Sequence, residues 1–111
     1  MTVIVVADVH GQTEAGYDGM IKALAGPIRR AEGFVLHSAY CVDGQWRVLE
    51  VWRSKADADH FFARQVAPHL PPGVRPKRTV YEAHSVVTAA TPCSPVPASR
   101  CARPRRARPR R

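Results

Sequence analysis

The sequence contains few of the residues that build disulfide frameworks or metal sites. Its 111 residues include three Cys, of which Cys41 falls in a predicted strand and the other two lie near the C-terminus. An odd number at these positions gives no disulfide framework, and neither a Cys-x-x-Cys motif nor closely spaced histidines indicate a metal site. We therefore expect a reduced, cytoplasmic setting and no bound metal. Cys41 is predicted to pack as a small apolar group.

Long apolar runs and glycine-rich loops are also missing. Residues 1–11 carry no Lys or Arg, and their apolar run is interrupted at Asp8, so we expect neither a secretory signal nor a membrane span. No phosphate-binding loop or dinucleotide fingerprint occurs in the chain. Any reaction that the protein catalyses is therefore expected to run without a nucleotide or another bound cofactor.

Positive charge is plentiful but is confined to one end of the chain. The formal net charge is +8, yet residues 1–88 contain ten Lys and Arg against nine Asp and Glu, and the remaining seven positive charges are Arg residues between Arg100 and Arg111. We predict one folded domain over residues 1–88 and a disordered Pro/Arg-rich tail over residues 89–111. The tail lacks the interleaved aromatic residues and the folded basic face of a specific nucleic-acid site, so nucleic acid is not the expected partner.

A β-hairpin is predicted around Asp43-Gly44, because this residue pair suits the two positive φ angles of a type I′ turn. Such a turn also sets the register of the two strands. Since side chains alternate along a strand, His37 and Glu50 should share one face with Trp46 and Trp52, and Phe34 should lie on the other. The expected opposite pairs are Val42 with Gln45, Cys41 with Trp46, Ala39 with Val48, His37 with Glu50, and Val35 with Trp52.

Periodicity and capping residues predict four further elements. They are a strand over residues 2–9, a helix from residue 14 to about residue 25 that Thr13 caps and Gly26-Pro27 ends, a second helix that begins after Ser54 and that Pro68 ends or kinks, and a last strand over about residues 78–88.

This order of elements predicts an α+β fold, the ferredoxin-like βαββαβ arrangement, in which a four-stranded antiparallel sheet carries both helices on one face. The first strand is apolar on both sides, and both faces of the hairpin carry large apolar residues. Two helices cover only one face of the sheet. We therefore expect the other face to pack against a second copy of the chain, which gives a homodimeric α+β barrel.

Several short features resemble the antibiotic biosynthesis monooxygenase-like superfamily of dimeric α+β barrels. They are Gly33-Phe34 at the start of the second strand, Glu50-Val51-Trp52 at the end of the third, the Ser54 cap, and a following helix that bears His60 and His69. The resemblance spans about residues 2–88 and implies a small-molecule pocket between the sheet and the helices. Members include cofactor-free oxygenases of polyketide phenols, haem-degrading enzymes, and cyclases or isomerases.

The complete absence of asparagine separates this chain from part of that superfamily. Haem-degrading members rely on an asparagine in the first strand together with a helix histidine, whereas this first strand offers Ala7 and Asp8, and only His69 corresponds to the histidine. Haem degradation is therefore not expected. The same absence argues against a direct transfer of the quinone-forming mechanism in which amide and Trp side chains assist.

His37 and Glu50 are the candidate catalytic pair, because a carboxylate that binds one ring nitrogen leaves the other free to act as a base near neutral pH. The alternative is a cross-strand pair with only a structural role. His60 is expected at the surface. The candidate substrate-binding residues are Trp52, Tyr17, Phe61, Tyr81, His84 and His69.

The leading functional hypothesis is a cofactor-independent monooxygenase that acts on an aromatic or polyketide-like small molecule. A non-oxidative cyclase or isomerase with the same base is a second hypothesis. A non-catalytic, stress-related ligand-binding barrel dimer is a third, and it would be preferred if His37 and Glu50 were fully buried without an adjoining cavity.

Overall fold

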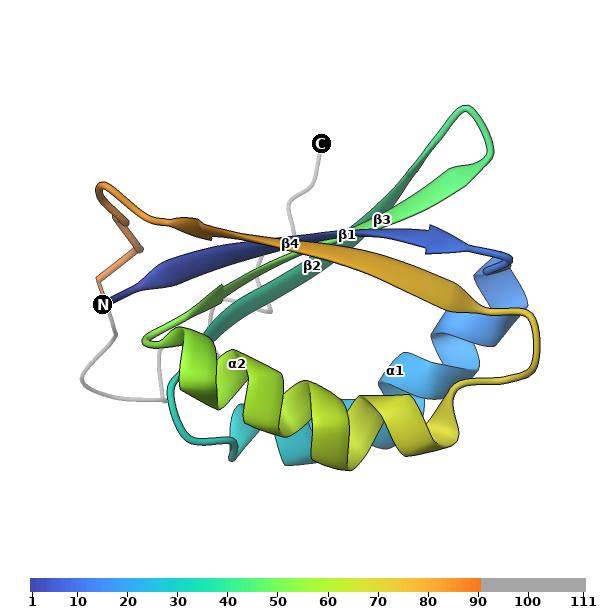
Figure 1. Cartoon of the computed structure of the whole chain (residues 1–111), viewed down its shortest axis with the longest axis horizontal. Coiled ribbons are helices and arrows are strands. Elements are labelled where there is room, and N and C mark those ends of the chain that lie inside the picture. Colours follow the sequence, from blue (N-terminus) through green and yellow to red (C-terminus); the bar gives the residue numbers. More distant parts are fainter. Residues whose placement is uncertain (91–111) are drawn as a thin grey trace, which may run out of the picture.

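The computed structural model describes residues 1–90 and arranges them as one sheet with two helices on one side (Figure 1). The predicted tail, residues 89–111, lies outside the described residues except for its first two positions. The elements are β1 (Val3–His10), α1 (Glu14–Arg29), β2 (Phe34–Val42), β3 (Gln45–Trp52), α2 (Lys55–Phe61), a π-helical turn (Phe62–Val66), a 3₁₀ turn (Ala67–His69) and β4 (Arg75–Glu82).

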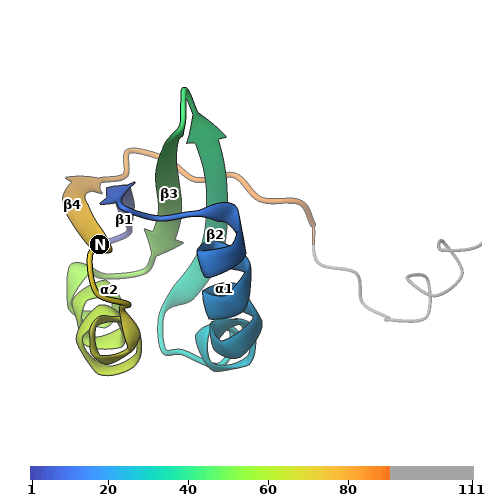
Figure 2. The ribbon, with the colours of Figure 1, turned by 90° about the vertical axis from the view of Figure 1, so that its right-hand side faces the viewer.

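The four strands follow the order β2-β3-β1-β4, and every neighbouring pair is antiparallel. The two helices lie side by side below the sheet and leave its upper face uncovered, as Figure 2 shows. This is the predicted ferredoxin-like architecture. The buried faces of β1, β3, α1 and α2 meet in a core that includes Val5, Ile28, Trp52 and Phe61. Among residues 1–90, no helix combines the length and apolar character needed to cross a bilayer.

The hairpin has the predicted turn and most of the predicted register. Asp43 and Gly44 take φ values of 50° and 76°, and His37 lies opposite Glu50. The predicted pairing of Val35 with Trp52 is wrong, because an irregularity between Phe34 and Leu36 places Phe34 opposite Trp52. Phe34 consequently joins the core face and packs edge-on against Trp52, with ring centroids 5.4 Å apart. A bulge of this kind adds one residue to one strand and reverses the facing of what precedes it.

Both helices begin at their predicted caps. The Thr13 side chain accepts a hydrogen bond from the Gly16 backbone at 3.0 Å, and that of Ser54 accepts one from the Asp57 backbone at 3.0 Å. The predicted end of the first helix is wrong, since α1 continues through Pro27 to Arg29. Proline removes only one backbone donor so near the helix end, and the burial of Ile28 holds the last turn against the core.

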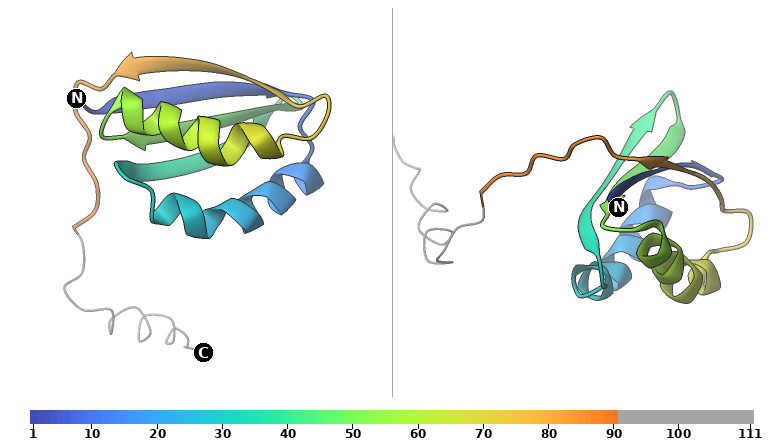
Figure 3. Two further views of the ribbon diagram at one scale, coloured as in Figure 1. Left: turned by 60° about the horizontal axis from the view of Figure 1, so that its bottom comes forward. Right: turned by 60° about the vertical axis from the view of Figure 1, so that its left-hand side comes forward.

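The last strand is shifted from its predicted position. β4 spans Arg75–Glu82 instead of about residues 78–88, because its partner β1 offers backbone groups only from His10 back to Val3. Pro76 is accommodated within β4 because this strand is at an edge of the sheet, where one side makes no ladder hydrogen bonds. Figure 3 shows β4 at the edge of the sheet, above α2.

Candidate functional site

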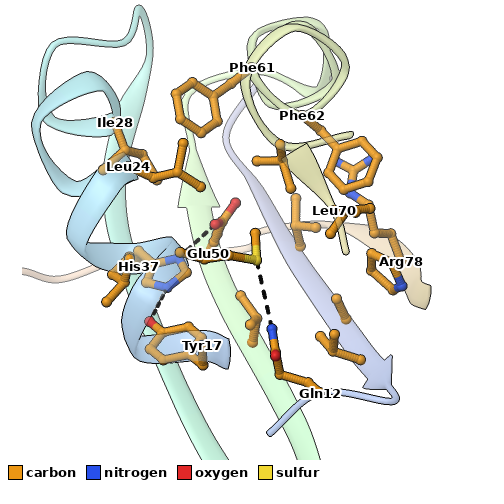
Figure 4. A pocket seen from close by; sticks show the side chains of 18 of the residues that line it. Gln12, Tyr17, Leu24, Ile28, His37, Glu50, Phe61, Phe62, Leu70 and Arg78 are labelled. Carbon is orange, nitrogen blue, oxygen red and sulfur yellow. Dashed lines mark hydrogen bonds and ion pairs between the residues drawn. The ribbon is translucent and has the colours of Figure 1, made fainter. Parts of the chain in front are cut away.

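A cavity lies between the sheet and the two helices, with a volume of about 90 Å³. Its wall is mainly apolar and its polar groups are few (Figure 4). The alternating side chains of β1 and β3 form the ceiling, one face of α1 and the segment from α2 to Leu70 form the sides, and β4 closes the far edge. The lining residues are Val5, Ala7, Val9, Gln12, Tyr17, Met20, Ile21, Leu24, Ile28, His37, Trp46, Val48, Glu50, Ala58, Phe61, Phe62, Val66, Leu70, Pro76 and Arg78.

Three polar side chains form a hydrogen-bonded row along one side of this cavity. Glu50 Oε2 lies 2.7 Å from His37 Nδ1, and His37 Nε2 lies 2.7 Å from the hydroxyl of Tyr17. The row crosses three elements, β3, β2 and α1. The side chains of His37 and Glu50 are 15% and 19% exposed, so the pair is partly shielded from solvent and still borders the cavity.

Trp52 anchors the buried end of this row. Its indole nitrogen donates a hydrogen bond to Glu50 Oε1 at 2.8 Å, and its side chain is completely buried. Both carboxylate oxygens of Glu50 therefore have a donor within the protein. This leaves the carboxylate little freedom to rotate, and it fixes the orientation of the His37 ring.

Tyr17 closes the other end of the row, where two aromatic contacts hold its ring. The Tyr17 ring stacks on Trp46 at 5.4 Å with an interplanar angle of 14°, and it lies nearly parallel to the His37 ring at 6.1 Å. Burial raises the pKa of the Tyr17 phenol, and the negative charges of Glu50 and Asp18 raise it further. The surroundings therefore disfavour an isolated tyrosinate at this position.

A cationic group closes the opposite wall of the cavity. The guanidinium of Arg78 lies 4.5 Å from the centre of the Phe62 ring, and Nη2 lies 3.2 Å from Asp59 Oδ1. Asp59 also pairs with Lys55 in the preceding turn of α2. These contacts tie α2 to β4, so Arg78 serves as part of the wall with its charge already partnered.

The structure brings four of the predicted site residues to the cavity and leaves four away from it. Tyr17, His37, Glu50 and Phe61 line the cavity. Trp52 lies behind Glu50, where it contacts no open space, so its predicted place in the wall is wrong.

The predicted places of Tyr81, His84 and His69 in the cavity are also wrong. Tyr81 pairs with Ile4 on the uncovered face of the sheet and is 57% exposed. His84 follows the end of β4 and is exposed. His69 is exposed, with Nδ1 2.9 Å from the backbone oxygen of Gln65. His60 is exposed, as expected.

Sequence reasoning missed Arg78, Gln12 and Met20 as lining residues. Arg78 shares its face of β4 with Pro76 and Val80, so alternation within β4 identifies it once the pairing with β1 is known. Gln12 lies in the turn before α1, and its amide nitrogen lies 3.7 Å from the Met20 sulfur. Neither residue carries a sequence motif that reveals its position.

The lining of this cavity offers no free imidazole for a haem iron. His37 is the only imidazole among the lining residues, and both of its ring nitrogens already have hydrogen-bond partners. Among residues 1–90, no group of three His, Cys, Asp or Glu side chains is placed to hold a metal ion.

The sheet order, the two helices on one face and the cavity between these layers define a ferredoxin-like α+β protein with the fold of the antibiotic biosynthesis monooxygenases. The resemblance inferred from the sequence is thus confirmed for the fold. No protein-family model matches the chain, and no curated protein matches its sequence.

Solved structures give the evidence for this fold. A protein from Deinococcus radiodurans described as a candidate antibiotic biosynthesis monooxygenase aligns with a TM-score of 0.57 and 20% identity, over 80% of this chain and 99% of its own. SnoaB, a cofactor-independent oxygenase from Streptomyces nogalater, aligns with a TM-score of 0.54 and 17% identity, over 79% of this chain and 98% of its own. The heme-degrader MhuD from Mycobacterium tuberculosis, with two hemes bound in its active site, aligns with a TM-score of 0.56 and 15% identity, over 78% of this chain and 99% of its own.

Proposed function

We propose that this protein is a small-molecule enzyme that removes a proton from a compact aromatic ligand and lets the resulting anion react with O₂. The single observation that carries this proposal is the His37–Glu50 pair, which borders an apolar cavity. An imidazole held by a carboxylate is a common general base, and general-base catalysis contributes about 10²–10⁴-fold to a rate. Glu50 fixes the ring orientation and stabilises the imidazolium that forms when His37 takes up a proton.

The proposed reaction balances without an external reductant. A phenol that loses its proton becomes an electron-rich anion, and oxygenation of the ring by one O₂ gives a quinone and one water. All four electrons that reduce O₂ come from the ring, so the proposal includes no bound cofactor. The protein then has to bind the ring, accept the phenolic proton and exclude bulk water, and its mainly apolar cavity suits these tasks.

The size of the cavity restricts the ligand. An apolar cavity of about 150 Å³ holds benzene in a well-studied protein, and the cavity here has about 90 Å³. A single aromatic ring is the ligand body nearest to this size. We accordingly propose a one-ring phenol as the substrate class in preference to a fused polyketide.

The two other hypotheses from the sequence differ in how well the site supports them. A non-oxidative cyclase or isomerase would use the same base, and oxygen uptake distinguishes it from the oxygenase. An apolar cavity favours the oxygenase, because O₂ is itself apolar. A non-catalytic ligand-binding barrel would be preferred if His37 and Glu50 were buried without an adjoining cavity. Both residues line the cavity, so the site favours an enzyme over this alternative.

The proposal also includes a homodimer. The sheet face opposite the helices carries exposed Leu36, Tyr40 and Tyr81, and the charges of residues 1–88 nearly cancel. Two copies of such a face meet without net repulsion and bury each other's apolar side chains. A reduced, cytoplasmic setting remains part of the proposal. The predicted packing of Cys41 as a small apolar group is wrong, because Cys41 is exposed, and within residues 1–90 its thiol is free.

The test of the proposed function is the His37→Ala variant. The purified protein is supplied with phenols of one to four rings, and oxygen uptake and product formation are measured together. Wild type should consume one O₂ for each one-ring phenol converted, and His37→Ala should lose at least about 100-fold of this rate. His60→Ala, which changes an exposed histidine of α2, is the matched control. Unchanged turnover in His37→Ala would exclude His37 as the base.

A further inference from the structure

We infer that Tyr17 is the residue that exchanges the proton with the ligand, and that His37 and Glu50 act through it. This inference rests on the proposed function and names the group that the substrate touches. It follows from the hydrogen bonds of His37, because a base needs an unoccupied lone pair within reach of the ligand.

Neither ring nitrogen of His37 is free. Glu50, as a carboxylate, only accepts hydrogen bonds, so His37 Nδ1 at 2.7 Å from Oε2 is the donor of that bond. In a neutral imidazole the other nitrogen then carries the lone pair. That nitrogen, Nε2, lies 2.7 Å from the Tyr17 hydroxyl and accepts its proton in the hydrogen bond. A ligand therefore reaches His37 only by displacing Tyr17.

Displacing Tyr17 would break several contacts at once. Its ring is stacked on Trp46, with the ring centroids 5.4 Å apart. Its backbone lies near the start of α1, which the Thr13 cap holds in place. The Tyr17 oxygen, in contrast, donates its only proton to His37 and retains lone pairs. Among residues 1–90 it has no second hydrogen-bond partner, and Tyr17 lines the cavity. The Tyr17 oxygen is thus the acceptor that the row presents to a ligand.

The proposed proton transfer involves the ligand, Tyr17 and His37, and each proton that leaves one group is bound by the next. The bond between the ligand oxygen and its proton breaks, and that proton forms a new bond to the Tyr17 oxygen. The original Tyr17 proton moves to His37 Nε2, which leaves an imidazolium beside the Glu50 carboxylate and an anionic ligand that accepts a hydrogen bond from Tyr17. No free tyrosinate forms during this exchange. This agrees with the raised pKa of Tyr17, since burial and the charges of Glu50 and Asp18 oppose a free tyrosinate.

The test uses 4-nitrophenol, a one-ring phenol whose anion is coloured, and needs no turnover. At a pH below the solution pKa of the probe, wild type should bind it as the phenolate. Tyr17→Phe keeps the ring and its stacking but lacks the hydroxyl, and the bound phenolate fraction should fall about tenfold. Tyr81→Phe, on the other face of the sheet, is the matched control and should behave as wild type.

The outcomes separate the two proposals. If wild type does not bind or does not ionise the probe, the proposed function fails and the inference falls with it. If wild type ionises the probe and a folded Tyr17→Phe variant does so equally well, the inference alone is overturned and His37 is the direct base.

A second measurement applies even if Tyr17→Phe folds poorly. The chain has three Tyr, so a variant with Tyr40→Phe and Tyr81→Phe retains only Tyr17. With 3-fluorotyrosine at this position, the ¹⁹F resonance should shift on binding of 4-nitrophenol. A resonance that stays in place at saturating probe would overturn the inference.

Discussion

At the scale of single residues, the most consequential side chain is Trp52. The sequence predicts a contact with the ligand, whereas the structure shows that Trp52 supports Glu50, the carboxylate that orients the proposed base His37. Its ring fills the centre of the core, where it contacts Phe34 and Phe61 at centroid distances of 5.4 and 5.5 Å. Its indole nitrogen meanwhile satisfies Glu50 Oε1. One residue therefore links the stability of the fold to the geometry of the site.

Trp52→Phe should lower the stability of the fold and disturb the geometry of the site. The phenyl ring keeps most of the apolar contact but removes the donor to Glu50, and a partly buried acceptor without its donor costs about 1–3 kcal/mol. We expect the free energy of unfolding in urea to fall by that amount, and turnover of a one-ring phenol to fall on the order of tenfold as Glu50 loses its fixed orientation. Phe34→Leu changes a core contact of Trp52 outside the cavity lining, leaves the donor to Glu50 in place and serves as the control. Equal losses of stability and turnover in the two variants would contradict this role for Trp52.

At the scale of elements, the wall formed by α2 and the turns after it depends on contacts with β4. The helix changes to a π-helical turn over Phe62–Val66, and the Ala67 backbone donates to the Phe62 oxygen. Pro68, which lacks an N–H, follows in the 3₁₀ turn. The widened turn brings Phe62, Val66 and Leu70 to the cavity. Asp59 and Arg78 connect this segment to the edge strand.

The ion pair of Asp59 predicts a pH dependence of stability. The hydrogen bond from Lys55 lowers the pKa of Asp59, and the hydrogen bond from Arg78 lowers it further. A carboxyl group whose pKa is lower in the folded state stabilises the fold above its unfolded pKa of about 3.9, and this contribution is lost as the pH falls through the folded value. Because the Asp59 side chain is 38% exposed, the contribution is at most about 1 kcal/mol.

Asp59→Asn should therefore lower the free energy of unfolding near neutral pH. The difference from wild type should shrink as the pH falls below about 4. Chemical unfolding at a series of pH values measures this difference. Glu32→Gln, at an exposed carboxylate for which residues 1–90 provide no ion pair, is the control. A difference that stays constant down to the lowest pH would show that the ion pair does not contribute.

At the scale of the whole molecule, the two sides of the sheet are unequally covered. On the helix side, Val3, Val5, Ala7 and Val9 of β1 are buried. On the other side, Ile4 and Val6 are only partly buried, and Asp8 pairs with Arg47 at 3.3 Å. The first strand is apolar on both sides, and within one chain it is buried on only one of them.

Leu36→Glu should separate the proposed dimer into monomers. Leu36 is 43% exposed on the uncovered sheet face, and a symmetric interface would place one new carboxylate from each copy in an apolar contact. Light scattering after size exclusion should give twice the chain mass for wild type and once the chain mass for the variant. Ala63→Glu, at an exposed position of the helical layer, should remain dimeric. A monomeric wild type would refute the homodimer.

Local patterns in the sequence were sufficient to predict the elements, their order and the central pair of the site. Asp43-Gly44 predicts a turn from backbone geometry alone, and this turn brings His37 opposite Glu50 without reference to any distant residue. The caps at Thr13 and Ser54 act in the same local way. Such features depend on neighbours within a few residues, which is why they can be inferred from the sequence.

Only the tertiary structure decided which of these residues share a cavity. β4 extends only as far as β1 offers backbone groups for pairing. The bulge at Val35 moves Phe34 to the core face. Tyr17 meets His37 because α1 packs across the hairpin, and Trp52 lies behind Glu50 because β3 is central in the sheet. These contacts join residues far apart in the chain, and their formation depends on how the layers pack. Periodicity within one element contains no information about that packing.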